Sequence, residues 1–156
     1  MSEKQMDAER KALAALDRLG AETVWLGSGG VGSVYFTRVQ ITDADLKHLK
    51  GLASLTTLSL NHSRITDAGL NRLLSLTSLV QLHLANTKIT DSGLEHLTSL
   101  KNLGFLDLSN TQVTNAGLEY LERLKKLKTI RLSGTKVTNN GVSKLKQALT
   151  VCKITL

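Results

Sequence analysis

The chain has 156 residues and a formal net charge of +7, and 41% of its residues are hydrophobic against 21% charged, which excludes disorder throughout. No run approaches the roughly 18 apolar residues that cross a bilayer. The N-terminal segment lacks the apolar core of a signal peptide, so we expect a soluble, cytoplasmic protein. One cysteine, no proline and five aromatic residues exclude a disulfide framework, a multi-thiolate metal site and an aromatic-lined cofactor cavity, so we expect no cofactor.

The first 40 residues predict a helix followed by a hairpin. Residues 3–19 carry apolar side chains at helical spacing, and Gly20 stops the pattern. The segments AETVWL (21–26) and SVYFTRV (33–39) alternate in polarity and flank a glycine-rich turn. Two such segments joined by glycines are typical of a β-hairpin.

The glycine-rich turn also matches a nucleotide-binding pattern. LGSGGVGSVY (26–35) fits the kinase loop G-x-G-x-x-G-x-V. The kinase loop works only with a strand lysine, an H-R-D loop and a D-F-G metal site, and none of these is present. A dinucleotide fingerprint would need a helix after the glycines, whereas a strand follows here. We therefore interpret the motif as a hairpin turn.

The rest of the chain is a repeat with a strict period of 24 residues. Five segments begin with Ile41, Ile65, Ile89, Val113 and Val137, and the fifth stops four residues short. The first half of each segment spaces leucines three apart, as an amphipathic helix does. The second half alternates as Leu-x-Leu or Ile-x-Leu, which predicts a short strand with one buried face. Such units bury their apolar faces only by stacking on one another.

Each predicted helix is preceded by a threonine and then by Asp or Asn. We predict that the threonine hydroxyl accepts an amide hydrogen bond as the N-cap, and that the Asp or Asn favours the positive end of the helix dipole. These threonines are Thr42, Thr66, Thr90, Thr114 and Thr138.

The pattern LxxLxLxxT, followed by an I-T-D-x-G-L helix, resembles leucine-rich repeat proteins. It is similar to the 24-residue bacterial type and to the cysteine-containing repeats of F-box proteins. The resemblance implies an α/β solenoid with parallel strands on the concave side and helices on the convex side, which binds other macromolecules. We expect one continuous domain, with residues 1–40 as an N-terminal cap and residues 41–156 as five repeats. The sequence departs from the family pattern at two places. The usual Asn after the strand is replaced by Ser63, Thr87, Thr111 and Thr135, and the first repeat has Asp45 where later copies have glycine.

The solvent side of the predicted strands, here called the strand face, is the predicted binding surface. Stepping through the repeats by 24 residues places one aromatic and several charged side chains on it. The predicted partner-binding residues are Tyr35, His83, Phe105, Asp107 and Arg131. His83 beside Asp107 has no nucleophile or oxyanion donor near it, so we interpret His83, Asp107 and Arg131 as a surface charge ladder rather than a catalytic site. The sequence thus predicts a non-enzymatic protein–protein interaction module with an unidentified partner.

Charge is concentrated near the C-terminus, where residues 123–156 hold nine basic residues and no acid. The predicted basic patch comprises Lys125, Lys126, Lys128, Lys144, Lys146 and Lys153. Three interpretations stay open: solvation of an open sheet edge, attraction of an acidic protein, and electrostatic binding of nucleic acid or a membrane surface. A role in substrate recognition for a ubiquitin ligase would need an F-box, and the sequence shows none.

The last strand has no predicted cap, so end-to-end self-association through its edge is a further hypothesis. At the position of Cys152 the other repeats have Thr56, Val80, Gly104 and Lys128, which differ in polarity. This predicts a partly exposed thiol, which could crosslink two chains. His48 and His96 lie two repeats apart, too far to share an ion, so no metal site is expected.

Overall fold

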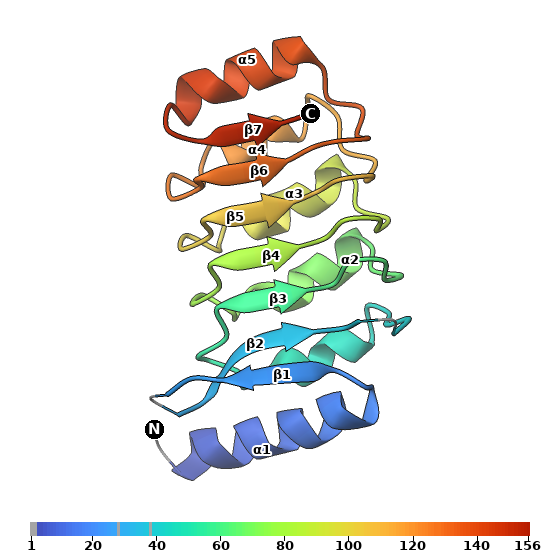
Figure 1. The fold of residues 1–156 in the computed structure, drawn as a ribbon, viewed down its shortest axis with the longest axis vertical. Helices are drawn as coiled ribbons and strands as arrows, with labels where there is room; N and C mark the ends of the chain where they lie inside the picture. The colour runs from blue at the N-terminus through green and yellow to red at the C-terminus, as the bar shows by residue number, and fades with distance from the viewer. Residues whose placement is uncertain (1–2, 28, 38) are drawn as a thin grey trace.

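The computed structural model describes residues 3–27, 29–37 and 39–156, which form a seven-stranded sheet with strands in chain order. The first two strands are antiparallel and all later neighbours are parallel. Figure 1 shows the strands stacked along the long axis, with one long helix at each end and short helices behind the sheet. The predicted solenoid is confirmed.

The elements are short and follow the predicted order. The strands are β1 (Glu22–Trp25), β2 (Val31–Tyr35), β3 (Thr57–Ser59), β4 (Gln81–His83), β5 (Phe105–Asp107), β6 (Thr129–Arg131) and β7 (Lys153–Thr155). The α-helices are α1 (Glu3–Arg18), α2 (Asp67–Leu70), α3 (Asp91–Leu97), α4 (Leu118–Leu121) and α5 (Asn139–Ala148), and the 3₁₀ helices are η1 (Asp45–Leu49) and η2 (Asn71–Leu73).

The register of the sheet follows the 24-residue period. Leu58 pairs with Leu82, Leu82 with Leu106, and Leu106 with Ile130. These side chains are fully buried, together with the leucines that space the helices, in one continuous core. Because strand residues alternate between faces, a one-residue slip would expose this whole row, and this fixes the register.

The threonines before the helices have a different main role from the predicted N-cap. The Asp43 carboxylate accepts hydrogen bonds from the Thr66 backbone N–H (2.8 Å) and hydroxyl (2.6 Å), 23 residues away in the next repeat. The same pair of bonds recurs between Asp67 and Thr90 and between Asp91 and Thr114. Asn115 and Thr138 repeat the contact with an amide. We call these four pairs the Asp–Thr ladder.

The predicted N-cap bond forms only in part. The Thr90 hydroxyl accepts from Ser92 N–H (3.3 Å) at the start of α3, and Thr114 accepts from Ala116 N–H ahead of α4. Thr66 and Thr138 make no side-chain cap bond. The expectation was wrong at these two positions. The Thr138 hydroxyl accepts from the Asn115 amide instead, whereas the Thr66 hydroxyl donates to the preceding repeat as those of Thr90 and Thr114 do. The Asp and Asn side chains of the Asp–Thr ladder therefore form hydrogen bonds between neighbouring repeats, in addition to lying near helix N-termini.

The ladder also explains why Asp45 departs from the glycine of later repeats. A Cβ at Gly69 would collide with the Asp43 carboxylate, and the same holds at the later copies, where the ladder acid or amide of the preceding repeat is in the way. The first repeat has Leu19 at the place of that acid, 24 residues before Asp43. There Asp45 itself accepts from the Thr42 N–H and hydroxyl, both at 2.8 Å. The Thr42 backbone hydrogen bond holds the pKa of Asp45 below its ordinary value.

The turns after the strands explain the missing asparagines. The hydroxyls of Ser63, Thr87, Thr111 and Thr135 each donate to the carbonyl three residues earlier, at 2.6–2.7 Å. One residue before each of them the backbone is left-handed, with φ of 60° at His62, 57° at Asn86, 56° at Asn110 and 72° at Gly134. Asn and Gly tolerate that conformation best. A hydroxyl thus closes each turn, and it is buried in the first three and partly buried at Thr135.

The N-terminal end has the predicted helix and hairpin, although Ser28 and Arg38 of the predicted hairpin lie outside the described residues. Glu9 of α1 is only 5% exposed, and its carboxylate accepts the Val31 N–H at 2.8 Å. Gly29 and Gly30 adopt φ of 86° and 89°, which glycine reaches without strain. The glycine-rich motif therefore has a structural role, in a turn that α1 holds in place.

Cys152 corrects one prediction. Its side chain is buried, with 6% exposed, and belongs to the core rather than to a partly exposed column. Desolvation raises the pKa of its thiol. Both features oppose the predicted crosslink between chains, since the thiolate is the reactive form.

Candidate functional site

The strand face presents two parallel rows of side chains on the side opposite the buried leucines. One row runs Tyr35, Ser59, His83, Asp107, Arg131 and Thr155, and the other runs Ser33, Thr57, Gln81, Phe105, Thr129 and Lys153. Neighbouring members of a row come from hydrogen-bonded strands, so their side chains lie about 5 Å apart. This is the arrangement that the period predicted.

Four of the five predicted binding residues form one cluster on β4, β5 and β6. The His83 and Phe105 rings lie 4.8 Å apart between centroids, tilted by 38°. The Arg131 guanidinium lies over the Phe105 ring, with its central carbon 5.3 Å from the ring centroid. We call His83, Phe105, Asp107 and Arg131 the strand-face cluster.

Asp107 is the buried member of this cluster and contacts Arg131. Its side chain is nearly buried, and one carboxylate oxygen accepts from the Ser109 N–H (3.0 Å) and hydroxyl (2.6 Å). The second oxygen lies 3.6 Å from Arg131 Nη1. The Asp107–Arg131 pair of the expected charge ladder is therefore present, but Asp107 is nearly buried rather than on the surface.

His83 differs from the ladder prediction as well. Burial against its neighbours lowers the pKa of His83, and the Arg131 charge lowers it further, while Asp107 opposes the shift. The ring is therefore neutral at physiological pH and packs as an aromatic surface on Phe105. The chemistry of the cluster is that of a binding surface with an aromatic centre and a cation at its rim.

Tyr35 lies apart from the cluster. It is half-buried on β2, and β3 separates it from His83, with the small Ser59 between them. The strand face thus has two separate aromatic positions, and the small polar Ser59 lies between them.

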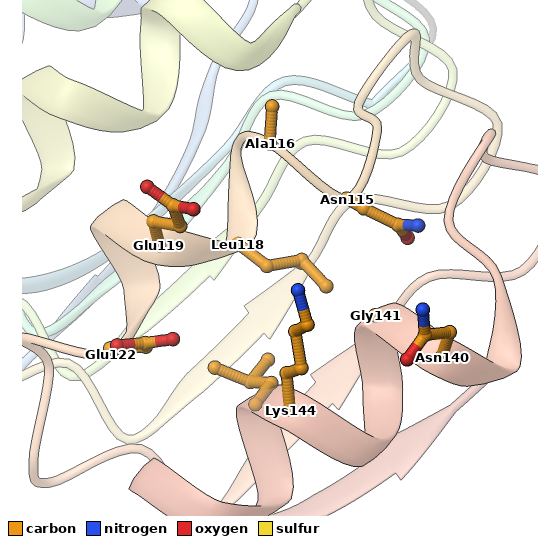
Figure 2. A pocket seen from close by; sticks show the side chains of 9 residues that line it. Asn115, Ala116, Leu118, Glu119, Glu122, Asn140, Gly141 and Lys144 are labelled. Carbon is orange, nitrogen blue, oxygen red and sulfur yellow. The ribbon is translucent and has the colours of Figure 1, made fainter.

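The six predicted basic residues do not form one uninterrupted patch. Lys144 projects from α5 into a hollow that Glu119 of α4 and Glu122, directly after α4, also line (Figure 2). Lys125 lies in a neighbouring hollow beside the same two acids. Sequence alone shows no acid after residue 122, but the fold brings these two carboxylates among the lysines.

The remaining lysines lie nearer the strands. Lys126 Nζ donates to Asn102 Oδ1 at 2.6 Å, and Lys125 Nζ donates to the Ala148 carbonyl at 3.3 Å. Lys128 and Lys153 precede or begin β6 and β7, whereas Lys146 is exposed on α5. The lysines are thus divided between the helices and the edge of the strand face.

Sequence reasoning missed two apolar features of the surface. Trp25 on β1 is 59% exposed, and Val151 before β7 is 82% exposed. It also missed a hollow beside Gly104, at the amino ends of β4, β5 and β6. The sequence does indicate this hollow. Thr56, Val80, Gly104 and Lys128 occupy the same position in successive repeats, and Gly104, which has no side chain, stands between two larger residues.

Across the described ranges, no three His, Cys, Asp or Glu side chains are grouped so that they could hold a metal ion. Nor does the described structure contain a helix with the length and apolar character needed to cross a membrane.

The period, the sheet register and the buried leucine rows define a solenoid repeat protein with an exposed strand face. The family models agree: one for two copies of the leucine-rich repeat matches residues 35–96, and one for a single repeat matches residues 95–121 and 123–146. The chain belongs to the leucine-rich repeat family. Its assignment to the bacterial 24-residue or F-box-type subtype stays a prediction.

Solved structures show the same fold. An internalin from Listeria monocytogenes is 28% identical with a TM-score of 0.67, over 80% of this chain and 34% of the internalin chain. A leucine-rich repeat protein from Leptospira interrogans is 26% identical with a TM-score of 0.50, over 70% of this chain and 33% of its own. The PEPR1–AtPEP1 structure, at 20% identity and a TM-score of 0.55, covers 86% and 19% and shows the fold alone.

The chain therefore spans about a third or less of these solved chains. No curated protein matches its sequence. A leucine-rich repeat fold of this kind suggests a module for protein–protein interaction.

Proposed function

We propose that this chain is a non-enzymatic module that binds a protein partner across the strand face, with Tyr35, His83, Phe105, Asp107 and Arg131 at the contact. The observation that carries the proposal is the strand-face cluster: a partly buried aromatic ring, Phe105, in contact with a neutral imidazole and with a guanidinium over it. Aromatic and arginine side chains dominate the binding energy of protein interfaces. The proposal takes residues 1–40 as a cap and residues 41–156 as one array of five repeats.

Preorganisation supports the proposal. Asp107 is fixed by Ser109 and faces Arg131, so the arginine loses less freedom when a partner binds than an unrestrained side chain would. The strands that carry the cluster are locked in register by backbone hydrogen bonds. A partner thus meets a rigid ladder of side chains rather than mobile loops.

Affinity capture from a lysate of the producing cell tests this function. The bait is the wild-type chain beside a variant with Tyr35, Phe105 and Arg131 changed to alanine, in about 150 mM salt with nuclease. The matched control changes the exposed helix residues Arg72, Glu95 and Lys146 to alanine. We expect a protein that the wild type and the control retain and the strand-face variant loses. Equal retention by all three baits would contradict the proposal.

Electrostatic binding through the basic residues is the alternative. Lys125, Lys126 and Lys128 support it, whereas Glu119 and Glu122 weaken the positive field around Lys144. This alternative predicts that nucleic acid or acidic lipid binds with an affinity that falls steeply with salt. If the strand-face variant binds nucleic acid or acidic lipid as strongly as wild type does, this result would favour the electrostatic alternative.

End-to-end self-association through β7 is also a proposal, supported by the exposed Val151 and Leu156. Sedimentation of the purified chain checks it, because association would raise the mass with concentration. The cytoplasmic location stays a prediction.

A further inference from the structure

We propose that the hollow beside Gly104 receives an acidic segment of the protein partner, with one apolar side chain of that segment seated over Gly104. The hollow is lined by Val80, Asn102, Gly104, Phe105, Lys126 and Lys128, among others. It adjoins the strand-face cluster, since Phe105 belongs to both. The inference rests on the proposed function, because it names the chemistry of the partner that the strand face binds.

The fold does not require a glycine at position 104. Its φ lies outside the left-handed region, and a Cβ there would meet its nearest atoms, the Lys126 carbonyl oxygen and Val80 Cγ1, only at 3.7 Å. The Gly104 N–H donates to the Val80 carbonyl and its own carbonyl accepts from Lys128 N–H, both at 2.8 Å, as in a regular ladder. At Gly93, by contrast, a Cβ would collide with the Asp67 carboxylate. Gly104 therefore leaves open space that no packing contact occupies.

Apolar carbon surrounds this space and is exposed to solvent. Val80, one repeat before Gly104 in the same column, is 40% exposed, and Val151 is the most exposed large apolar residue of the described chain. Both line the hollow together with Leu127 and Phe105. Covering such a surface with an apolar side chain is favourable, because it removes apolar area from water.

The rim of the hollow is positive. Lys125, Lys126 and Lys128 line it, and no described Asp or Glu does. The hydrogen-bond partners of Lys125 and Lys126 are a carbonyl and an amide, both uncharged. Neither of the two salt bridges within the described ranges involves any of the three. Carboxylates on a partner would therefore meet Lys126 and Lys128, which have no acid beside them in this hollow, whereas Lys125 also borders the hollow that Glu119 and Glu122 line.

The shape favours an extended segment. The hollow reaches from Val80 to Val151 and so crosses the starts of three successive strands, β4 to β6, and ends at the loop before β7. The loops that enter these strands lie on one side of the sheet, at the left in Figure 1. A single-stranded nucleic acid would need several aromatic side chains for base stacking, whereas Phe105 is the one aromatic among the lining residues. The observations thus favour an acidic peptide.

Selection of random 12-residue peptides displayed on phage, in about 150 mM salt, tests the proposal on the whole chain. We expect the enriched peptides to carry an apolar residue flanked by Asp or Glu. Synthetic copies should bind Gly104→Leu at least about tenfold more weakly than wild type, and Gly104→Ala about threefold more weakly. The alanine variant keeps the test valid if leucine perturbs folding, because its Cβ fits at ordinary contact distance.

A matched lysine pair separates local contact from general attraction. Lys128→Gln removes a rim charge, and Lys146→Gln removes the same charge from α5, which does not line the hollow. We expect weaker peptide binding by about threefold for Lys128→Gln and no change for Lys146→Gln. Equal losses in the two variants would overturn the proposal.

The remaining outcomes are decisive as well. Selection without enrichment, enriched peptides without acids, or unchanged binding to Gly104→Leu and Gly104→Ala would overturn the inference. If Arg131→Ala loses the peptides while both Gly104 variants keep them, the proposed function stands and this inference fails. If none of these variants changes binding, both fail. A single-stranded 12-nucleotide DNA that binds wild type but not Gly104→Leu, and displaces the peptides, would make the occupant a nucleic acid and overturn the inference.

Discussion

The Asp–Thr ladder and the strand face repeat with the same period but differ in how much their residues vary. The ladder uses the same Asp or Asn, the same Thr and the same Gly in successive repeats. The strand face changes residue type at every step, from Ser59 to His83 to Asp107 to Arg131. Positions that repeat satisfy a contact between neighbouring repeats, whereas positions that vary lie on the strand face, where no such contact constrains the residue type and where we propose that a partner binds.

The two variations within the ladder support this distinction. Asn115 replaces an acid but still accepts the Thr138 N–H at 2.9 Å, and its amide donates to the Thr138 hydroxyl. Asp45 replaces a glycine only in the first repeat, where no preceding acid occupies the space. Each change keeps the threonine N–H and hydroxyl hydrogen-bonded.

The largest expected effect separates two glycines. Gly93→Ala places a Cβ against the Asp67 carboxylate and Leu70, so we expect a loss of about 2 kcal/mol in the free energy of unfolding. Gly104→Ala, where a Cβ meets nothing closer than 3.7 Å, should change it by less than about 0.5 kcal/mol. Guanidinium denaturation of the two variants checks the pair, and equal losses would contradict the packing argument.

The next effect concerns the ladder itself. Asp67→Ala leaves the Thr90 N–H and hydroxyl without their acceptor, which should cost about 2 kcal/mol. Asp67→Asn should recover most of that loss, because Asn115 makes the corresponding contact in this chain. Urea denaturation gives both values. A loss as large for asparagine as for alanine would show that charge, rather than hydrogen bonding, holds the repeats together.

A smaller effect is expected from pH at the strand face. Burial lowers the pKa of His83 below its ordinary value of 6.5, so the unfolded chain takes up this proton at a higher pH than the folded chain. The contribution of His83 to stability is therefore complete above pH 6.5 and is lost as the pH falls through its lower folded value. Denaturation of wild type and His83→Gln between about pH 8 and about pH 5 should show a steeper acid loss in wild type. Parallel profiles would contradict the assigned shift.

Much of the fold follows from the sequence, because the 24-residue period and the leucine spacing determine which side chains are buried. The same period predicts that His83, Phe105, Asp107 and Arg131 lie on adjoining strands, as the structure shows. The function of Asp43 could not be read from its neighbours, since its partner Thr66 lies 23 residues away. The local pattern alone suggests that Asp43 lies at a helix N-terminus. Only the stacking of the repeats shows that it accepts hydrogen bonds from Thr66.

The site was less predictable than the fold for a physical reason. The Asp107 carboxylate is nearly buried and accepts a hydrogen bond from Ser109, and desolvation lowers the pKa of His83. Cys152 was assigned by its column, yet its own side chain turns into the core. Repeat phase gives the position of a residue but not how far its neighbours cover it.

The central claim is that recognition lies on the varying strand face and stability in the repeated contacts. Titration of the captured partner against Phe105→Ala/Arg131→Ala, with the free energy of unfolding measured on the same sample, tests it most directly. We expect binding to weaken by about 1–3 kcal/mol while the free energy of unfolding stays close to the wild-type value. Unchanged affinity in this double variant would contradict the claim and move the site towards the basic residues of 123–153.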